Sequence, residues 1–304
     1  MALNRSDFRK QLQQGLNTVF GMEYKQYPEE WRGLFTVSSS GKAFEEDVLM
    51  AGFGAAPVKG EGAGVEYDEG AESFVARYNH ETIALAFAIT EEAEEDGLYG
   101  ALGAKYAKAL ARSLQHTKEV KGANVLNNGF SSSFIGGDNV SLFSTSHPLW
   151  GGGTQSNKLA TPADISEASL EEAFIQIADW VDERGIPTAI TAKCLVIPTE
   201  LQFIAERILK SANRSGTSDN DVNAIKSMGM LPGGVKVNHR LTDADAWFLI
   251  TDCPDGLKHM VRKKVSRGIE GDFETGNMRY KARERYSFGW SNYRGGFASE
   301  GAAT

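Results

Sequence analysis

Ser146, His147 and Asp164 are residues whose types could form a hydrolytic triad in this chain. In such a site the histidine takes a proton from the serine hydroxyl, and the aspartate orients the imidazole ring. The Gly-x-Ser-x-Gly pattern that presents a nucleophilic serine on a sharp turn is not found around Ser146. Because Pro148 follows His147, we interpret this histidine as a loop anchor and predict no catalytic residue.

A cluster of glutamates could supply a pair of catalytic carboxylates. The cluster follows Thr90 and consists of Glu91, Glu92, Glu94 and Glu95. Carboxylates in the first turn of a helix are stabilised by the positive end of the helix dipole. We therefore interpret the cluster as the start of a helix rather than as acid–base machinery.

Metal and nucleotide cofactors are not predicted either. Asp219, Asp221 and Asn223 match the first half of a calcium loop, but Ala224 and Met230 replace its glycine and its closing glutamate. The five histidines have no metal-ligand spacing; they are His80, His116, His147, His239 and His259. Two glycine-rich runs lack the phosphate-binding fingerprints; they are the glycines at 60, 62 and 64, and Gly151–Gly153.

The two cysteines, Cys194 and Cys253, are not part of a Cys-x-x-Cys pair. Both lie in apolar, strand-like runs, which predicts buried and reduced thiols. The sequence has no apolar N-terminal segment typical of a signal peptide and no run long enough to span a membrane. With a net charge of −8, the chain also lacks the basic excess of a conventional DNA-binding module.

One strongly basic pattern remains, near the C-terminal end. Residues 278–290 alternate as a long strand, and one face carries four cations that we call the basic stripe: Arg279, Lys281, Arg283 and Arg285. On the other face Glu284 interrupts an otherwise apolar row, so part of that side should be wet or paired. We expect the stripe to pair with acids within or between subunits, although an inward face that touches DNA stays open.

Several elements must position these residues. An amphipathic helix is expected over 7–20, and a Gly-rich two-stranded loop over 51–80, with strands at Val65–Tyr67 and Ser73–Asn79. Leucines at spacing four predict a long helix from about residue 91 to Gly122. A second helix should begin at Ser169 with a Ser169–Glu172 capping box. Further expected elements are a helix at 200–210 and strands at 82–89, 194–197, 235–238, 247–251 and 257–265.

In this order, the elements resemble the Hong Kong 97-type major capsid proteins of tailed bacteriophages, and Mu-type head subunits in particular. The resemblance covers roughly residues 50–298 and depends on an ordered set of segments rather than on one motif. These segments are 142–149 (Leu-Phe-Ser-Thr-Ser-His-Pro-Leu), 169–174, 194–201 (Cys-Leu-Val-Ile-Pro-Thr-Glu-Leu), 240–249 and, as the most specific, 272–290.

The resemblance implies an α+β fold with five parts. They are an N-terminal arm (1–50), an extended loop (51–81), a peripheral subdomain with a long spine helix (82–163 and 255–290), an α/β axial subdomain (164–254) and a C-terminal tail (291–304). An isolated hairpin is marginally stable in water, so the extended loop is expected to order on a neighbouring subunit. Hinges are expected at the glycines around 51–70 and in the loop 127–153.

The function that the resemblance implies is structural rather than enzymatic: self-assembly of pentamers and hexamers into an icosahedral shell around phage DNA. The expected partners are further copies of the chain, a portal and a decoration protein, with DNA contacted non-specifically and no membrane. Either a separate scaffolding protein or prior cleavage of a scaffolding region is also expected, because only about fifty residues precede the extended loop. The expected location is the virion, and the host cytoplasm during assembly.

Two alternatives stay open. An encapsulin-like nanocompartment shares the fold but encloses an enzyme, so cargo rather than DNA would accompany its shells. A soluble α/β hydrolase would instead work as a small oligomer and would depend on His147.

Overall fold

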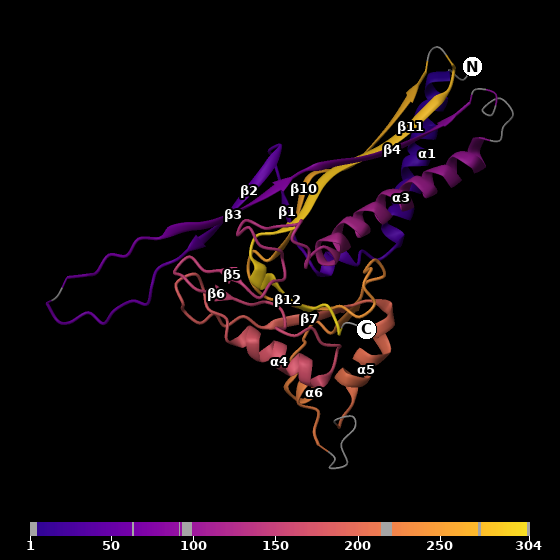
Figure 1. The fold of residues 1–304 in the computed structure, drawn as a ribbon. Helices are drawn as coiled ribbons and strands as arrows, with labels where there is room; N and C mark the ends of the chain where they lie inside the picture. The colour runs from indigo at the N-terminus through magenta and orange to yellow at the C-terminus, as the bar shows by residue number, and fades with distance from the viewer. Residues whose placement is uncertain are drawn as a thin grey trace.

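The computed structural model describes residues 5–62, 64–90, 92, 99–213, 221–272 and 275–302. Two four-stranded sheets, each with its own helices, form the body, and a long two-stranded ribbon projects from it (Figure 1). The remaining short elements are the strand pair β5 (His147–Pro148) and β6 (Thr154–Gln155) and three 3-10 turns, η1 (Trp31–Gly33), η2 (Thr199–Leu201) and η3 (Tyr293–Gly295).

The first sheet has the strand order β1-β10-β11-β4, in which β1 runs parallel to β10 and the other pairs are antiparallel. Its strands are β1 (Thr36–Ser39), β10 (Leu257–Gly271), β11 (Met278–Trp290) and β4 (Glu81–Ile89). Two long helices, α1 (Arg5–Gln26) and α3 (Tyr99–Asn127), lie along it (Figure 1). The strand predicted at 278–290 is confirmed at both ends.

The apolar face of β11 explains where the helices pack. Tyr280 and Ala282 are fully buried and form one cluster with Phe20 of α1 and with Leu110 and Leu114 of α3. The alternate residues of β11 therefore point to the opposite face of the sheet. There Arg279, Lys281 and Arg283 are exposed.

Helix α3, the expected spine helix, is longer than predicted at its C-terminal end. It passes Gly122 and continues to Asn127, because Gly122 is a packing position and not a terminator. A Cβ atom at Gly122 would lie 2.9 Å from the Cβ of Trp31, so only glycine allows this close approach. Of the expected cap, Glu91, Glu94 and Glu95 lie outside the described residues.

The second sheet has the strand order β12-β9-β7-β8. These strands are β12 (Gly296–Ser299), β9 (Trp247–Thr251), β7 (Ala192–Ile197) and β8 (Val235–Val237), and the helices near them are α4 (Glu167–Ala178), α5 (Gln202–Lys210) and α6 (Ala224–Met228). All residues of β9 and most of β7 are buried, because core clusters contact both faces of the sheet. The C-terminal β12 pairs with β9 and completes this α/β unit.

The predicted start of α4 is wrong by three residues. Its N-cap is Ser166, whose hydroxyl accepts a hydrogen bond from the Ser169 N–H at 3.1 Å. The Ser169 hydroxyl in turn accepts from the Ser166 N–H at 2.9 Å, which closes a capping box. Glu172, the residue expected in this role, instead accepts a hydrogen bond from Gln176 one turn later.

A two-stranded ribbon is present, and the strand predicted at Ser73–Asn79 is confirmed within it, but its partner differs from the one predicted. It pairs β2 (Phe44–Ala51) with β3 (Ala71–Asn79) in antiparallel register. Val65–Tyr67 is not a strand, since residues 52–62 opposite it carry several glycines and Pro57, which do not support a ladder. Residues 52–62 and 64–70 therefore form the part of the extended loop that lies beyond the ribbon and outside any sheet (Figure 1).

Candidate functional site

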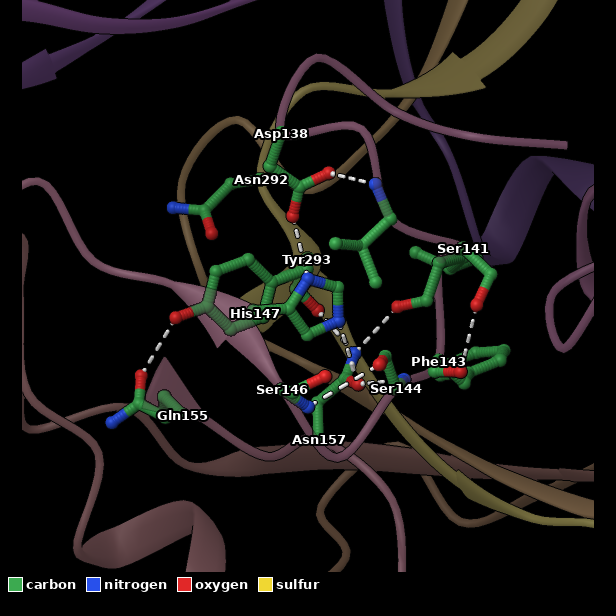
Figure 2. A network of polar contacts seen from close by, with 12 residues as sticks. Asp138, Ser141, Phe143, Ser144, Ser146, His147, Gln155, Asn157, Asn292 and Tyr293 are labelled. Carbon is green, nitrogen blue, oxygen red and sulfur yellow. Dashed lines mark hydrogen bonds and ion pairs between the residues drawn. The ribbon is translucent and has the colours of Figure 1, made fainter. Parts of the chain in front are cut away.

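His147 lies at the centre of a buried polar network (Figure 2). Its side chain is fully buried and stacks on the Tyr293 ring at 3.9 Å with an interplanar angle of 2°. Nδ1 lies 2.6 Å from Oδ2 of Asp138, and Nε2 lies 3.1 Å from Oδ1 of Asn157. Both ring nitrogens are therefore occupied by partners from the same chain.

The orientation of the Asn157 amide decides what His147 can do. Its Nδ2 donates to the carbonyl oxygens of Leu142, Tyr293 and Gly296 at 2.7, 3.1 and 3.2 Å. Oδ1 consequently faces His147, and because an amide oxygen only accepts, Nε2 of His147 must donate to it. No lone pair on Nε2 is left to take a proton from a nucleophile.

Ser146 and Asp164, the other two residues of the triad considered in the sequence, do not contact this histidine. Ser146 is exposed, and the contact that places it is a hydrogen bond from its own N–H to the Ser144 hydroxyl. Asp164 is also exposed, and its carboxylate accepts from the Ala302 N–H at 2.8 Å. His147 is thus the loop anchor that the sequence predicted, and this geometry gives no support to a hydrolase.

The network ties the loop after α3 to the C-terminal strand. Asn157 bonds the carbonyls of Tyr293 and Gly296, and the N–H of Ala298 donates to the Asn157 carbonyl at 3.1 Å. A buried network with this many satisfied partners is rigid. It argues against the hinge that we expected in 127–153.

A second buried network lies where the extended loop joins the body. Arg294 and Glu183, each almost completely buried, form an ion pair at 2.9 Å. The other Glu183 oxygen accepts from the Trp150 N–H at 3.0 Å. This pair fixes the turn that contains the next residue, Arg184.

Arg184 holds the root of the extended loop. Its Nε donates to the Gly52 carbonyl at 3.0 Å and its Nη2 to the Glu69 carbonyl at 2.5 Å, so one guanidinium joins both limbs. The guanidinium also lies over the Trp150 ring at 4.5 Å from the centroid. Asp68 closes the root: the Gly54 N–H donates to its carboxylate and, with smaller contributions from Glu69 and Arg184, lowers its pKa.

Beyond this root, the extended loop has large apolar side chains that the described residues leave mostly exposed. Val58 and Tyr67 are 101% and 97% exposed, and Val65 is 68% exposed. Exposed apolar groups on a projecting element are typical of an interaction surface. The loop therefore has the character of one half of an interface.

The acid pairing predicted for the basic stripe is confirmed at two of its four positions. Arg279 forms an ion pair with Asp272, and Lys281 lies 3.9 Å from Glu270, with both side chains of the latter pair largely exposed. Within the described ranges neither Arg283 nor Arg285 has a carboxylate partner. The stripe thus keeps unpaired positive charge on an open face.

The part of the chain that the structure describes contains no assembled thiol or metal site. Cys194 is buried, Cys253 is half-buried, and both are free thiols. Burial raises the pKa of Cys253 to about 12, which keeps that thiol protonated. In the same ranges, no three His, Cys, Asp or Glu residues are placed to hold a metal ion, while Asp219 lies outside them. None of the described helices has the length and apolarity needed to cross a bilayer.

Comparison with known proteins identifies the family to which this fold belongs. The family model described as phage capsid protein matches residues 75–299, from β3 to β12. The chain belongs to this phage capsid protein family. No curated protein matches the sequence.

Solved structures agree with the family at the level of the fold. The virus-like particle from Pyrococcus furiosus has 11% identity and a TM-score of 0.54, over 94% of the capsid protein described here and 98% of that chain. The capsid of an empty GTA particle has 13% identity and a TM-score of 0.53, over 90% of both chains. The procapsid of bacteriophage JBD30 has 15% identity and a TM-score of 0.51, over 99% and 77%.

Together these findings confirm two predictions for this capsid protein: the Hong Kong 97-type α+β fold, and the function class of a structural major capsid protein of a bacteriophage head. Arg184, Glu183, Trp150 and Asn157 were not singled out from the sequence. Their contacts join residues that are distant in the chain, and no short motif signals them.

Proposed function

We propose that this capsid protein builds an icosahedral shell around phage DNA and that each subunit lays its extended loop over a neighbouring copy. The observation that carries the proposal is the exposure of Val58, Val65 and Tyr67 on a loop without a core of its own. Ordering such a segment costs about 1–2 kcal/mol per residue in backbone entropy. Burial against a second subunit would offset this cost.

We also propose a division of the chain into five parts that suits an assembly role. We propose an N-terminal arm (1–50), an extended loop (51–81), a peripheral subdomain (82–163 and 255–290), an axial subdomain (164–254) and a C-terminal tail (291–304). The two separate sheets support the peripheral and axial units, and β1 of the arm joins the peripheral sheet while β12 of the tail joins the axial sheet. In this scheme the axial unit lines the centres of pentamers and hexamers, and the loop links neighbours around each ring.

Shell assembly needs many modest contacts rather than one strong one. Copies in a closed symmetric assembly repeat the same interfaces, so weak contacts add through multivalency. We propose a purely structural role without catalysis, and the geometry at His147 supports this reading.

The proposed partners besides further copies are a scaffolding protein, a portal and a decoration protein, with packaged DNA contacted non-specifically. The chain's net charge of −8 supports a DNA contact that does not depend on strong binding. We propose assembly in the host cytoplasm, while the mature location is the virion capsid.

The test is electron microscopy of the purified chain and of a variant that lacks residues 55–67. This deletion keeps the root contacts of Gly52, Asp68 and Arg184. The wild-type chain should form shells or capsomers. The deletion variant should keep its circular dichroism spectrum and its urea midpoint but form no shells.

A matched control keeps the loop length and removes only its apolar side chains, through Val58→Ser, Val65→Ser and Tyr67→Ser. It should reduce shell yield without changing the stability of the unassembled subunit. Normal shells from the deletion variant would contradict the role proposed for the extended loop.

A further inference from the structure

We propose that the exposed face of helix α3 is the surface on which this capsid protein contacts packaged double-stranded nucleic acid, through the phosphate backbone. We call this face the helix row, and it consists of Lys105, Lys108, Arg112 and His116. The inference rests on the proposed shell function, and it adds the side chains that the nucleic acid meets.

The charge of α3 is opposite in sign to that of the whole chain. The chain has a net charge of −8, whereas α3 contains five lysines and arginines and a single carboxylate, Glu119. Glu119 is buried, and so is Lys118, which pairs with Glu284 on the sheet. The exposed side of the helix therefore carries cations and no carboxylate.

The helix row is a straight line of side chains. Its members are three or four residues apart, so neighbours are about 5–6 Å from each other and the row spans about 16 Å. All four are exposed, and with Ala109 and Ser113 between them they line a shallow depression of about 550 Å³. Duplex DNA carries one phosphate charge per about 1.7 Å of its axis, so a row of this length lies against several phosphates. The depression has no large apolar side chain among its lining residues to anchor a protein partner, which favours a nucleic acid.

One member of the helix row is held in position from α1. Nε of Arg112 donates to Oε1 of Glu23 at 2.7 Å, and its guanidinium lies 5.3 Å from the centroid of the Tyr27 ring. The Glu23 side chain is 4% exposed, whereas that of Arg112 stays 60% exposed. Lys105 and Lys108 have no ion-pair partner among the described residues. These two lysines therefore supply the charge that is left for an anionic partner.

The basic stripe is the competing surface, and it faces the other way. α3 packs on β11 through Leu110, Leu114 and Tyr280, so the helix row lies on the outer side of the helix and the stripe on the far side of the sheet. A closed shell can turn only one of these two faces toward its contents. The stripe is partly neutralised by two acids of its own hairpin, Asp272 and Glu270, whereas α3 has no exposed carboxylate. The helix row is therefore the better match to a polyanion.

Binding of a short fluorescein-labelled DNA duplex to the unassembled full chain tests this surface. The salt concentration is about 0.1 M, at which charges more than about 10 Å apart are largely screened. Lys105→Glu with Lys108→Glu should raise the dissociation constant at least tenfold. Lys281→Glu with Arg283→Glu is the matched control, because it makes the same change in net charge on the stripe. It should raise the dissociation constant less than about threefold.

A neutral variant separates the loss of phosphate contacts from an effect of added negative charge. Lys105→Gln with Lys108→Gln should reduce the slope of log affinity against log salt by about 2, because each phosphate contact contributes about 0.9 to this slope. Both row variants should keep the urea midpoint and the shell yield of wild type, since the two lysines are exposed. Closed wild-type shells, in which the row faces inward, should bind added duplex at least tenfold more weakly per subunit than the unassembled chain.

The outcomes separate this inference from the proposed function. If wild-type chain forms shells but the stripe variant loses as much DNA binding as the row variant, the surface is wrong while shell assembly stands. The same holds if closed shells bind the duplex as tightly as the unassembled chain, or if the unassembled chain does not bind it. Displacement of the duplex by an equal charge of polyglutamate would assign the helix row to an acidic protein and would also overturn the inference. If wild-type chain forms neither shells nor capsomers, the proposed function itself fails.

Discussion

The pair of Lys118 on α3 and Glu284 on β11 is the strongest single test of how the peripheral layers are held together. Their charged atoms lie 2.6 Å apart, and the side chains are only 11% and 2% exposed. Tyr24 of α1 donates to the same carboxylate oxygen at 3.0 Å, so the pair connects two helices and the sheet. Glu284 is the residue that interrupted the apolar face of the predicted strand, and Lys118 is the partner that it required.

The magnitude follows from burial. At an effective dielectric constant of about 20, the attraction at this separation is roughly 6 kcal/mol, which approximately offsets the cost of desolvating both ions. Lys118→Met would leave Glu284 as a buried charge without its cation. We expect it to lower the free energy of unfolding by about 3–5 kcal/mol.

A double-mutant cycle checks this value. The unassembled chain is unfolded in urea, and tryptophan fluorescence monitors the unfolding. Lys118→Met with Glu284→Leu removes both charges, and should cost only about 1–3 kcal/mol, mainly because Tyr24 loses its acceptor. Lys121→Met is the matched control on the same helix, where the ion pair with Glu81 is more exposed; it should cost less than about 1 kcal/mol. A loss below about 1 kcal/mol for Lys118→Met, or a double variant that equals the sum of its single changes, would refute the reasoning.

Three further predictions concern other sites. Burial raises the pKa of Glu119 to about 7, so the folded chain keeps a proton that the unfolded chain releases between the ordinary value of 4.5 and 7. Glu119 therefore makes the folded chain less stable as the pH rises through this window. The free energy of unfolding of wild type, measured relative to Glu119→Gln, should be about 3 kcal/mol lower above the window than below it. A difference that does not change with pH would contradict the assignment. Asn157→Ala should cost at least about 3 kcal/mol in urea unfolding, whereas exposed Ser146→Ala should change it by less than about 0.5 kcal/mol; equal effects would argue against the network. Arg184→Ala should speed amide hydrogen exchange at the loop root about tenfold, with Arg184→Lys in between, and unchanged exchange would show that the guanidinium does not hold the root.

Local pattern predicted those elements whose burial is regular. The strict alternation of β11 gave both of its ends, since one face meets the helices and the other meets solvent. The end of α3 was missed because Gly122 has two meanings in a sequence, terminator or packing position. Only the neighbouring Trp31 decides between them.

The candidate interface was only partly predictable for a related reason. Composition identified a projecting loop and a basic stripe, but it placed one strand of the ribbon at Val65–Tyr67. The true partner of β3 is β2, on the far side of the unpaired loop. The contacts of Arg184 and Glu183 could not be predicted, because they depend on how the axial unit and the ribbon meet in space.

The most direct measurement is a cryo-electron microscopy map of shells assembled from the wild-type chain, at a resolution that traces residues 52–70. The density of this segment should continue from its Arg184-held root onto an adjacent subunit and be ordered there. Density that folds back over its own subunit, and leaves the adjacent subunit uncovered, would contradict the account.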